Sequence, residues 1–245
     1  MSKSNKKKTS MGLILAVLAA AVLIAALLLI PGKEQLPQET EAAAVTETVA
    51  ETTEAAEAVI LKNALQIEKI DSYTGLYVED GSDEAVSGLL MMIVTNISED
   101  PIQYAEITLT LGEETGRFTV SVLPAGGSAV LIEQNRMVFD ETADYTQAQA
   151  ECVHLAGFDK ALSLQQDKLD VQVLNGAINI TNISGSDITG DIILCYKNVS
   201  NGVYHGGIAY RVRLEGGLKE GEIKQIMGTH FHQPGSEILF VDIAE

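Results

Sequence analysis

"VTNISEDPI" (Val94–Ile102) returns later in the chain, little changed, as "ITNISGSDI" (Ile180–Ile188). The offset between the first residues of the two stretches is 86. Further on, "LPAGGSAVL" (Leu123–Leu131) matches "LKEGEIKQI" (Leu218–Ile226) at an offset of 95, which is expected if the second copy has a longer hairpin. The stretch "KNVSNGVYHGG" has the length to form it. Two copies of one β-domain explain this pattern most simply.

The Asn-Ile-Ser strings, like "NVS" at 198–200, also match the acceptor for N-glycosylation. The alternative is a repeated turn at a strand end, because an Asn side chain bonds readily to the backbone two residues on. In that interpretation Asn96 and Asn182 make the turns, and Ile97 and Ile183 hold them on the core. We favour the turn because the rest of the chain has bacterial character.

From Val59 onward, short apolar runs alternate with Gly, Asn, Asp and Ser, without a sustained helical period. "RFTVSVL" at 117–123 and "YRVRL" at 210–214 alternate apolar and polar residues, as in antiparallel strands with one wet face. The sequence therefore predicts an all-β fold, with one β-sandwich domain at 59–158 and a second at 159–245.

Each copy has a strand ending in Thr-Asn-x-Ser, a turn, a strand rich in Ile and Leu, and then Leu-x-x-Gly before another strand. This order resembles the bacterial extracytoplasmic Ig-like β-sandwiches of the FxLYD type. The second copy is the more similar, at "DIILCYKNVSNG" (Asp191–Gly202), and the resemblance spans most of Leu65–Ile243. It implies tandem β-sandwich modules on a cell-envelope protein, with no catalytic residues to transfer. We also expect no cofactor.

"MGLILAVLAAAVLIAALLLI" at 11–30 has no charge and is long enough for a bilayer core of about 30 Å. Its Leu, Ile and Val residues favour insertion by about 4–7 kcal/mol. A cleaved signal peptide is the alternative, but the run exceeds the usual apolar region of such peptides and lacks a small-x-small site at its end. The lysines of residues 1–10 predict a cytoplasmic N-terminus and exported C-terminal domains in a single-pass membrane protein.

Residues 31–58 are rich in Ala, Thr and Glu and cannot bury apolar surface, so we expect a disordered stalk. The whole chain has 34 acidic and 16 basic residues, a net charge of −18. A surface this acidic repels phosphate backbones, so nucleic acid is not an expected partner.

Two sets of side chains are candidates for binding a cation. His230 and His232 are two residues apart in "THFHQ", a spacing that places both on one face of a strand, and His205 could be a third ligand. The acidic loop "VEDGSDEA" could hold calcium through carboxylate oxygens; its candidates are Glu79, Asp80, Asp83 and Glu84. The alternatives are an exposed strand end for the histidines and a solvated hairpin tip for the acids.

The sequence contains no recognisable catalytic motif, so we do not expect an enzyme. Cys152 and Cys195 each lie in an apolar strand-like run in a different copy, which favours two buried free thiols over a disulfide.

"LLMMIV" at 89–94 is apolar on both faces of a strand, although a sandwich strand normally keeps its outer face polar. Its cover could come from within the chain, from the segment Ile60–Ile70 or from the second domain. Alternatively, Leu90, Met92 and Val94 form an interaction surface for a partner, because exposed apolar patches mark such sites.

From these features we expect a membrane-anchored, extracytoplasmic, non-catalytic module that acts as a scaffold or accessory subunit beside another envelope protein. The alternative is an extracytoplasmic sensor that binds a cation or small ligand.

Overall fold

The computed structural model describes residues 58–244, and in this range the protein is all-β, as predicted. The predicted cytoplasmic tail, membrane helix and stalk lie outside the described residues, with the exception of Ala58. Within 58–244, no helix has the length and apolar character needed to cross a membrane. The one helical element there is a 3-10 turn, η1 (Tyr145–Gln147).

The strands fall into two groups along the chain, an N-terminal half and a C-terminal half. The strands of the N-terminal half are β1 (Val59–Leu61), β2 (Leu65–Tyr77), β3 (Glu84–Asn96), β4 (Ile102–Leu111), β5 (Glu114–Leu123), β6 (Ser128–Ile132) and β7 (Gln149–Gly157). Those of the C-terminal half are β8 (Leu169–Leu174), β9 (Ala177–Asn182), β10 (Ile192–Ser200), β11 (Val203–His205), β12 (Tyr210–Leu214), β13 (Ile223–Ile226) and β14 (Ser236–Ile243).

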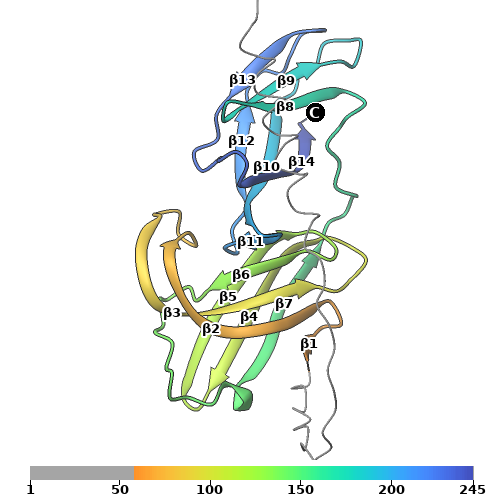
Figure 1. The fold of residues 1–245 in the computed structure, drawn as a ribbon. Coiled ribbons are helices and arrows are strands. Elements are labelled where there is room, and N and C mark those ends of the chain that lie inside the picture. The colour runs from red at the N-terminus through yellow and green to blue at the C-terminus, as the bar shows by residue number, and fades with distance from the viewer. Residues whose placement is uncertain (1–57, 245) are drawn as a thin grey trace, which may run out of the picture. The chain divides into compact units, whose positions relative to one another are not determined.

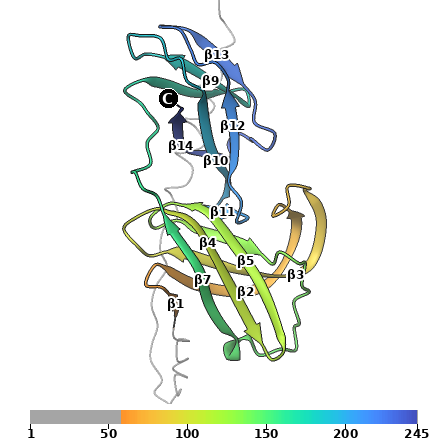
Figure 2. The same ribbon diagram turned by 180° about the vertical axis from the view of Figure 1, so that it is seen from behind.

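The two halves repeat one strand order. In the N-terminal half, β2, β3 and β6 are neighbours in one layer. The other layer is formed by β5, β4 and β7, which lie side by side in Figure 2. In the C-terminal half, the corresponding layers are β8-β9-β13 and β12-β10-β14. Each half therefore has two antiparallel layers with the same connections, and β1 adds a fourth strand beside β2 in the N-terminal half.

The register repeats as well. In the N-terminal half Thr95 of β3 lies opposite Ser128 of β6, and in the C-terminal half Thr181 of β9 lies opposite Ile223 of β13. These pairs differ in number by 86 on one strand and by 95 on the other, the two offsets expected from the sequence. The repeated letters therefore correspond to repeated positions in space.

One difference between the halves is the longer hairpin that follows β10 in the second one. β10 continues past its layer, turns at Asn201-Gly202 and returns as β11, and both turn residues have positive φ, as this tight turn requires. β11 then pairs in parallel with β6 of the N-terminal half (Figure 1). This pairing joins strands of both halves into one eight-stranded sheet.

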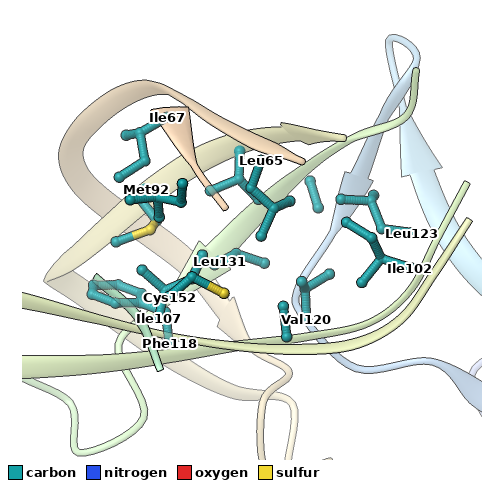
Figure 3. Packing of buried hydrophobic residues seen from close by; sticks show 14 of the residues in the cluster. Leu65, Ile67, Met92, Ile102, Ile107, Phe118, Val120, Leu123, Leu131 and Cys152 are labelled. Carbon is teal, nitrogen blue, oxygen red and sulfur yellow. The ribbon is translucent and has the colours of Figure 1, made fainter. Parts of the chain in front are cut away.

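A separate hydrophobic core fills each half. In the N-terminal half Met92, from β3, points into the same core as Ile107 and Phe118 from the facing layer (Figure 3). In the C-terminal half Ile178 and Leu194 are equivalent core residues, both fully buried. Each such side chain stabilises the fold by about 1.5–3 kcal/mol.

A buried asparagine ties the two layers of each half together. The Asn96 side chain is fully buried, and its Nδ2 donates hydrogen bonds to the carbonyl oxygens of Asp100 (2.9 Å), Leu123 (3.1 Å) and Pro124 (3.2 Å). Its Oδ1 accepts from the backbone N–H and the hydroxyl of Ser98. The end of β3 is thereby fastened to the end of β5, which belongs to the other layer.

Asn182 makes the same bonds at the equivalent place. Its Nδ2 donates to the carbonyl oxygens of Ser186 (2.7 Å), Leu218 (3.0 Å) and Lys219 (3.1 Å). Its Oδ1 accepts from the N–H and hydroxyl of Ser184. The Thr-Asn-Ile-Ser repeat is therefore a structural turn, and both amide nitrogens are engaged inside the protein.

One part of the expectation for this turn is wrong. Ile97 and Ile183 do not hold the turn on the core, because their side chains are 43% and 51% exposed. The turn is held by the asparagine amide and by backbone bonds, such as the one from Ile97 N to the carbonyl of Ala64.

Replacing either asparagine by alanine should lower the free energy of unfolding by about 2–4 kcal/mol, because buried carbonyls lose their shared donor. Chemical denaturation of Asn96→Ala and Asn182→Ala measures this, with Ile97→Ala and Ile183→Ala as controls that should change stability by less than about 0.5 kcal/mol. Equal effects for all four variants would contradict the assigned role of the amides.

Candidate functional site at the junction of the two halves

The three candidate histidines do not converge. His205, in β11, lies 3.0 Å through Nε2 from the hydroxyl of Tyr73. His230 lies in a turn, where Nδ1 is 2.9 Å from a carboxylate oxygen of Asp83 and the ring stacks on Tyr210. His232 is exposed in the same turn, so the expected strand with both imidazoles on one face does not form.

The four candidate acids also point to different partners. Glu79 turns inward, toward the backbone of Gly207, and Asp83 pairs with His230. Asp80 and Glu84 both pair with the guanidinium of Arg136, at 3.0 and 2.7 Å. Across residues 58–244, no three His, Cys, Asp or Glu side chains are grouped so that they could hold a metal ion.

Both cysteines are free and buried, as expected from their apolar surroundings. Cys152 belongs to the N-terminal core, and Cys195 lies in the middle of β10. Burial raises the pKa of both thiols, which disfavours the reactive thiolate.

The interaction surface expected at Leu90, Met92 and Val94 is not a surface. These three side chains are at most 2% exposed and lie in the N-terminal core, so that expectation is corrected and the alternative, cover within the chain, is confirmed. The register explains the correction, because this face of β3 looks toward β4 and β5.

The opposite face of β3 is covered too. Leu89 and Met91 pack under the far end of the β2–β3 hairpin, against Tyr73 and Tyr77. Ile208, which follows β11 in the C-terminal half, packs against the same cluster. Cover for the doubly apolar strand therefore comes partly from the second half, which was one of the two sources expected.

This cover, the pairing of β11 with β6 and a set of buried polar contacts together form the junction between the halves. Glu79, just after β2, accepts hydrogen bonds from the backbone N–H of Gly207 at 2.9 and 3.0 Å and from that of Ile132 at 3.0 Å. One carboxylate thus binds a backbone donor from each half.

Lys197 approaches the same loop from the other side. It is fully buried, and its Nζ donates to the carbonyl oxygens of Ser121 (3.1 Å), Gly207 (3.1 Å) and Ile208 (2.8 Å). These three acceptors use all the donors of the ammonium group. Because Ser121 belongs to β5, Lys197 also bridges the halves.

Gly207 is the meeting point of these contacts. Its N–H binds Glu79, and its carbonyl accepts from the N–H of Ser121 at 2.7 Å and from Lys197. A Cβ at this position would collide with the carbonyl oxygen of Thr119, and one at Gly206 would collide with Val78. The Gly-Gly pair therefore permits the backbones of the two halves to come this close.

Burial shifts the pKa values of both charged residues toward their neutral forms. It raises the pKa of Glu79, although the backbone donors and Lys197 oppose the shift. It lowers the pKa of Lys197 to about 8, with the charge of Glu79 acting in the opposite direction. Burying these two charges therefore costs desolvation free energy, and their polar atoms are satisfied only when the two halves fit together in this orientation.

The surrounding side chains are aromatic. Tyr210 stacks between Tyr196 and His230, with ring centroids 5.5 and 4.7 Å away, and its hydroxyl is buried without a hydrogen-bond partner. Burial raises the pKa of Tyr210 to about 12, so the phenol stays neutral at ordinary pH.

Two open grooves, of about 450 and 760 Å³, lie along the segment that leads from β7 to β8. The smaller groove is lined mainly by aliphatic residues such as Leu164 and Ile238. The larger one is also lined by charged residues: Glu99, Asp100, Asp159, Lys160 and Glu237. Neither is lined by Cys, His, Ser or Thr. The polar network of the junction does not open into either groove.

Reasoning from the sequence missed Lys197 and Gly207, the residues on which the junction depends. One signal could have found Lys197: it lies inside the apolar strand "IILCYKNVS", and alternation along that strand places it on the same face as Cys195, which was expected to be buried. The signal for Gly207 is the doubled glycine directly after "VYH". Glu79 was among the candidates, but as a calcium ligand.

Replacing Met92 by glutamate should unfold the N-terminal half, because an unpaired carboxylate would be buried between its layers. Circular dichroism and thermal melting check this, with Val138→Glu as the control, since Val138 is 69% exposed. A Met92→Glu chain that melts like the wild type would contradict the burial of this side chain between the layers.

Lys197 should make stability rise with pH. In the folded state the lysine loses its proton near pH 8, and in the unfolded chain near 10.5, so between these values the unfolded state binds more protons. The unfolding free energy should therefore increase by up to about 1.4 kcal/mol per pH unit from pH 8 to 10.

The measurement is denaturation at several pH values for the wild type and for Lys197→Met, with Lys160→Met, at an exposed position, as the matched control. The difference between wild type and Lys197→Met should change across this window, while the difference between wild type and Lys160→Met stays constant. A constant difference for both variants would show that Lys197 is not held in a buried site.

Comparison of the chain with protein-family models, with curated proteins and with solved structures finds no match. The function is therefore inferred from the sequence and from the geometry of residues 58–244.

Proposed function

We propose that this chain is a membrane-anchored, extracytoplasmic, non-catalytic module that serves as a scaffold or accessory subunit of a cell-envelope complex. The observation that carries the proposal is the use made of the buried charges. Glu79 and Lys197 direct their polar atoms at backbone groups of both halves. Chemistry on a substrate would require such groups to face an accessible space, whereas a scaffold requires them to fix one part against another.

The proposal includes a finer description of the fold as two tandem Ig-like β-sandwiches of the FxLYD type, at 59–158 and 159–245. It is supported by the repeated strand order, by the separate core in each half and by the equivalent bonds of Asn96 and Asn182. In this description the second module adds β11 to the sheet of the first.

The proposal also includes the anchor at 11–30, the cytoplasmic tail before it and the acidic stalk after it. The uncharged run with lysines on its N-terminal side supports this orientation, which places both β-modules outside the membrane. A stalk of like charges would extend and lift the modules away from the membrane surface.

The coupling of the halves favours a scaffold over a hinged binding protein. Three kinds of contact join them: the β6–β11 pairing, the apolar packing of Ile208, and polar contacts. The polar contacts are those at Gly207 and the pairs Tyr73–His205 and Asp83–His230. Two modules fixed in this way present their outer surfaces to a partner at a constant spacing, so the partner loses less freedom on binding.

We expect photo-crosslinking residues on exposed positions of both halves to give discrete adducts with another envelope protein in intact cells. Protease added outside those cells should remove the β-modules and leave the anchor. Protection of the C-terminal modules would contradict the extracytoplasmic location, and adducts of no defined mass would contradict the scaffold.

A matched pair of glycine variants tests whether the coupling matters. Gly207→Ala should separate the halves and weaken the adducts, whereas Gly157→Ala should leave them unchanged, since a Cβ there meets nothing within 4 Å.

Titration calorimetry of the full chain with zinc, copper and calcium tests the alternative sensor function. Heat of binding together with a raised melting temperature would favour the sensor over the scaffold.

A further inference from the structure

The layer β8-β9-β13 has an outward face with an unusual composition. The pairing registers place eight residues on it, of which Ala177 is buried, and Met227 follows the end of β13 directly; we call these nine residues the C-terminal outer face. They form three rows across the sheet: Leu174, Ala177 and Met227; Gln172, Asn179 and Gln225; and Asp170, Thr181 and Ile223.

Only one of these nine residues, Asp170, is charged, although the whole chain has a net charge of −18. Met227, Ile223 and Leu174 are 76%, 65% and 54% exposed, which makes them three of the most exposed large apolar side chains within 58–244. Depletion of charge together with exposed aliphatic residues is the composition of a protein–protein contact surface.

The N-terminal half shows what becomes of the equivalent face. There the same positions of β3 and β6 include Met91, Ile93 and Ile132, and this face is covered by Tyr77 and Ile208. One cover is the long end of the β2–β3 hairpin, and the other comes from the next half along the chain.

The C-terminal half has neither cover in the described part of the chain. Its hairpin is short, because β8 and β9 have six residues each and join through the two-residue turn Asn175-Gly176. The exposed fractions of Met227, Ile223 and Leu174 show that no other residue within 58–244 covers these side chains. Among the residues that the structure describes, a face that is an internal contact in one half is therefore exposed in the other.

The edge of this layer is protected against strand addition, although its face is open. Lys224, in the middle of the edge strand β13, points inward and donates to the carbonyl of Gly217 at 3.0 Å. An inward-pointing lysine on an edge strand discourages pairing with another strand. The equivalent residue of β6 is Ala129, and that edge does accept a strand, β11.

We propose that the C-terminal outer face binds the same face of a second copy of this chain, so that the protein is a symmetric dimer. Two copies repel through their acidic surfaces, and a nearly uncharged face is where this repulsion is smallest. Gln172 donates to Asp170 and Gln225 donates to Asn179 within the face. The remaining amide oxygens and N–H groups of this row both accept and donate, so they can pair with the same row across a two-fold axis. The layers would pack face to face, about 10 Å apart.

Light scattering of the full chain in detergent should give the mass of a dimer. The double variant Ile223→Glu/Met227→Glu places four carboxylates in the dimer contact and should raise the dissociation constant at least about tenfold. The control Leu76→Glu/Val153→Glu alters two exposed apolar residues of the N-terminal half and should leave the mass unchanged.

Cysteine crosslinking gives a second measurement that does not depend on detergent. Asn179 is at the centre of the face, so oxidation of membranes containing Asn179→Cys should trap a covalent dimer, while Thr108→Cys, on the outward side of β4, should not. The native cysteines are buried and do not interfere.

A wild-type monomer at every soluble concentration overturns the proposal. So does a dimer that survives the Ile223→Glu/Met227→Glu change with a normal melting curve. Loss of a different co-purifying protein in that variant, with the wild-type chain monomeric, would assign the face to another partner and also overturn it. These results leave the scaffold function standing, since that function is tested by adducts to other envelope proteins.

Discussion

One buried amide in each half holds the two layers of that half together. A β-sandwich must keep its layers in register at their ends, where few side chains interdigitate. The Nδ2 groups of Asn96 and Asn182, at the ends of β3 and β9, do this by donating to backbone carbonyls at or next to the strand ends of the other layer. Because three carbonyls share one donor group, no apolar residue of similar size can take its place. The four letters occur twice in the sequence because their geometry is needed twice.

Once both halves have this frame, their differences determine how they associate. The N-terminal half has long β2 and β3 strands, which curl over one face, and the C-terminal half has a longer β10–β11 hairpin, which reaches the edge of β6. Each addition covers apolar surface that the frame alone would leave exposed. The doubly apolar strand β3 is thus explained by its position, with the core on one side and Tyr73, Tyr77 and Ile208 on the other.

The junction adds charge to this packing. A buried ion such as Lys197 is expensive unless every donor is satisfied, and here three carbonyls from both halves satisfy it. Glu79 accepts hydrogen bonds from the backbone N–H groups of Ile132 and Gly207. Because Gly207 has no side chain, its backbone can come close to the backbone of β5. Such an arrangement contributes specificity more than stability, because the halves satisfy these charges only in the correct orientation. This is the physical basis for the proposal that the two halves act together as a scaffold.

The all-β class, the duplication with its two offsets, the longer second hairpin and the buried free cysteines could all be derived from the residues alone. They obey local rules: alternation along strands, turn residues and the apolar neighbours of each thiol. Only the tertiary structure revealed the partners of Glu79, Lys197 and His230. It also decided which face of β3 lies in the core and left Ile97 exposed. The reason is that spacing along a strand gives the face of a side chain but not what lies opposite, and the partners of these residues come from segments distant in the chain.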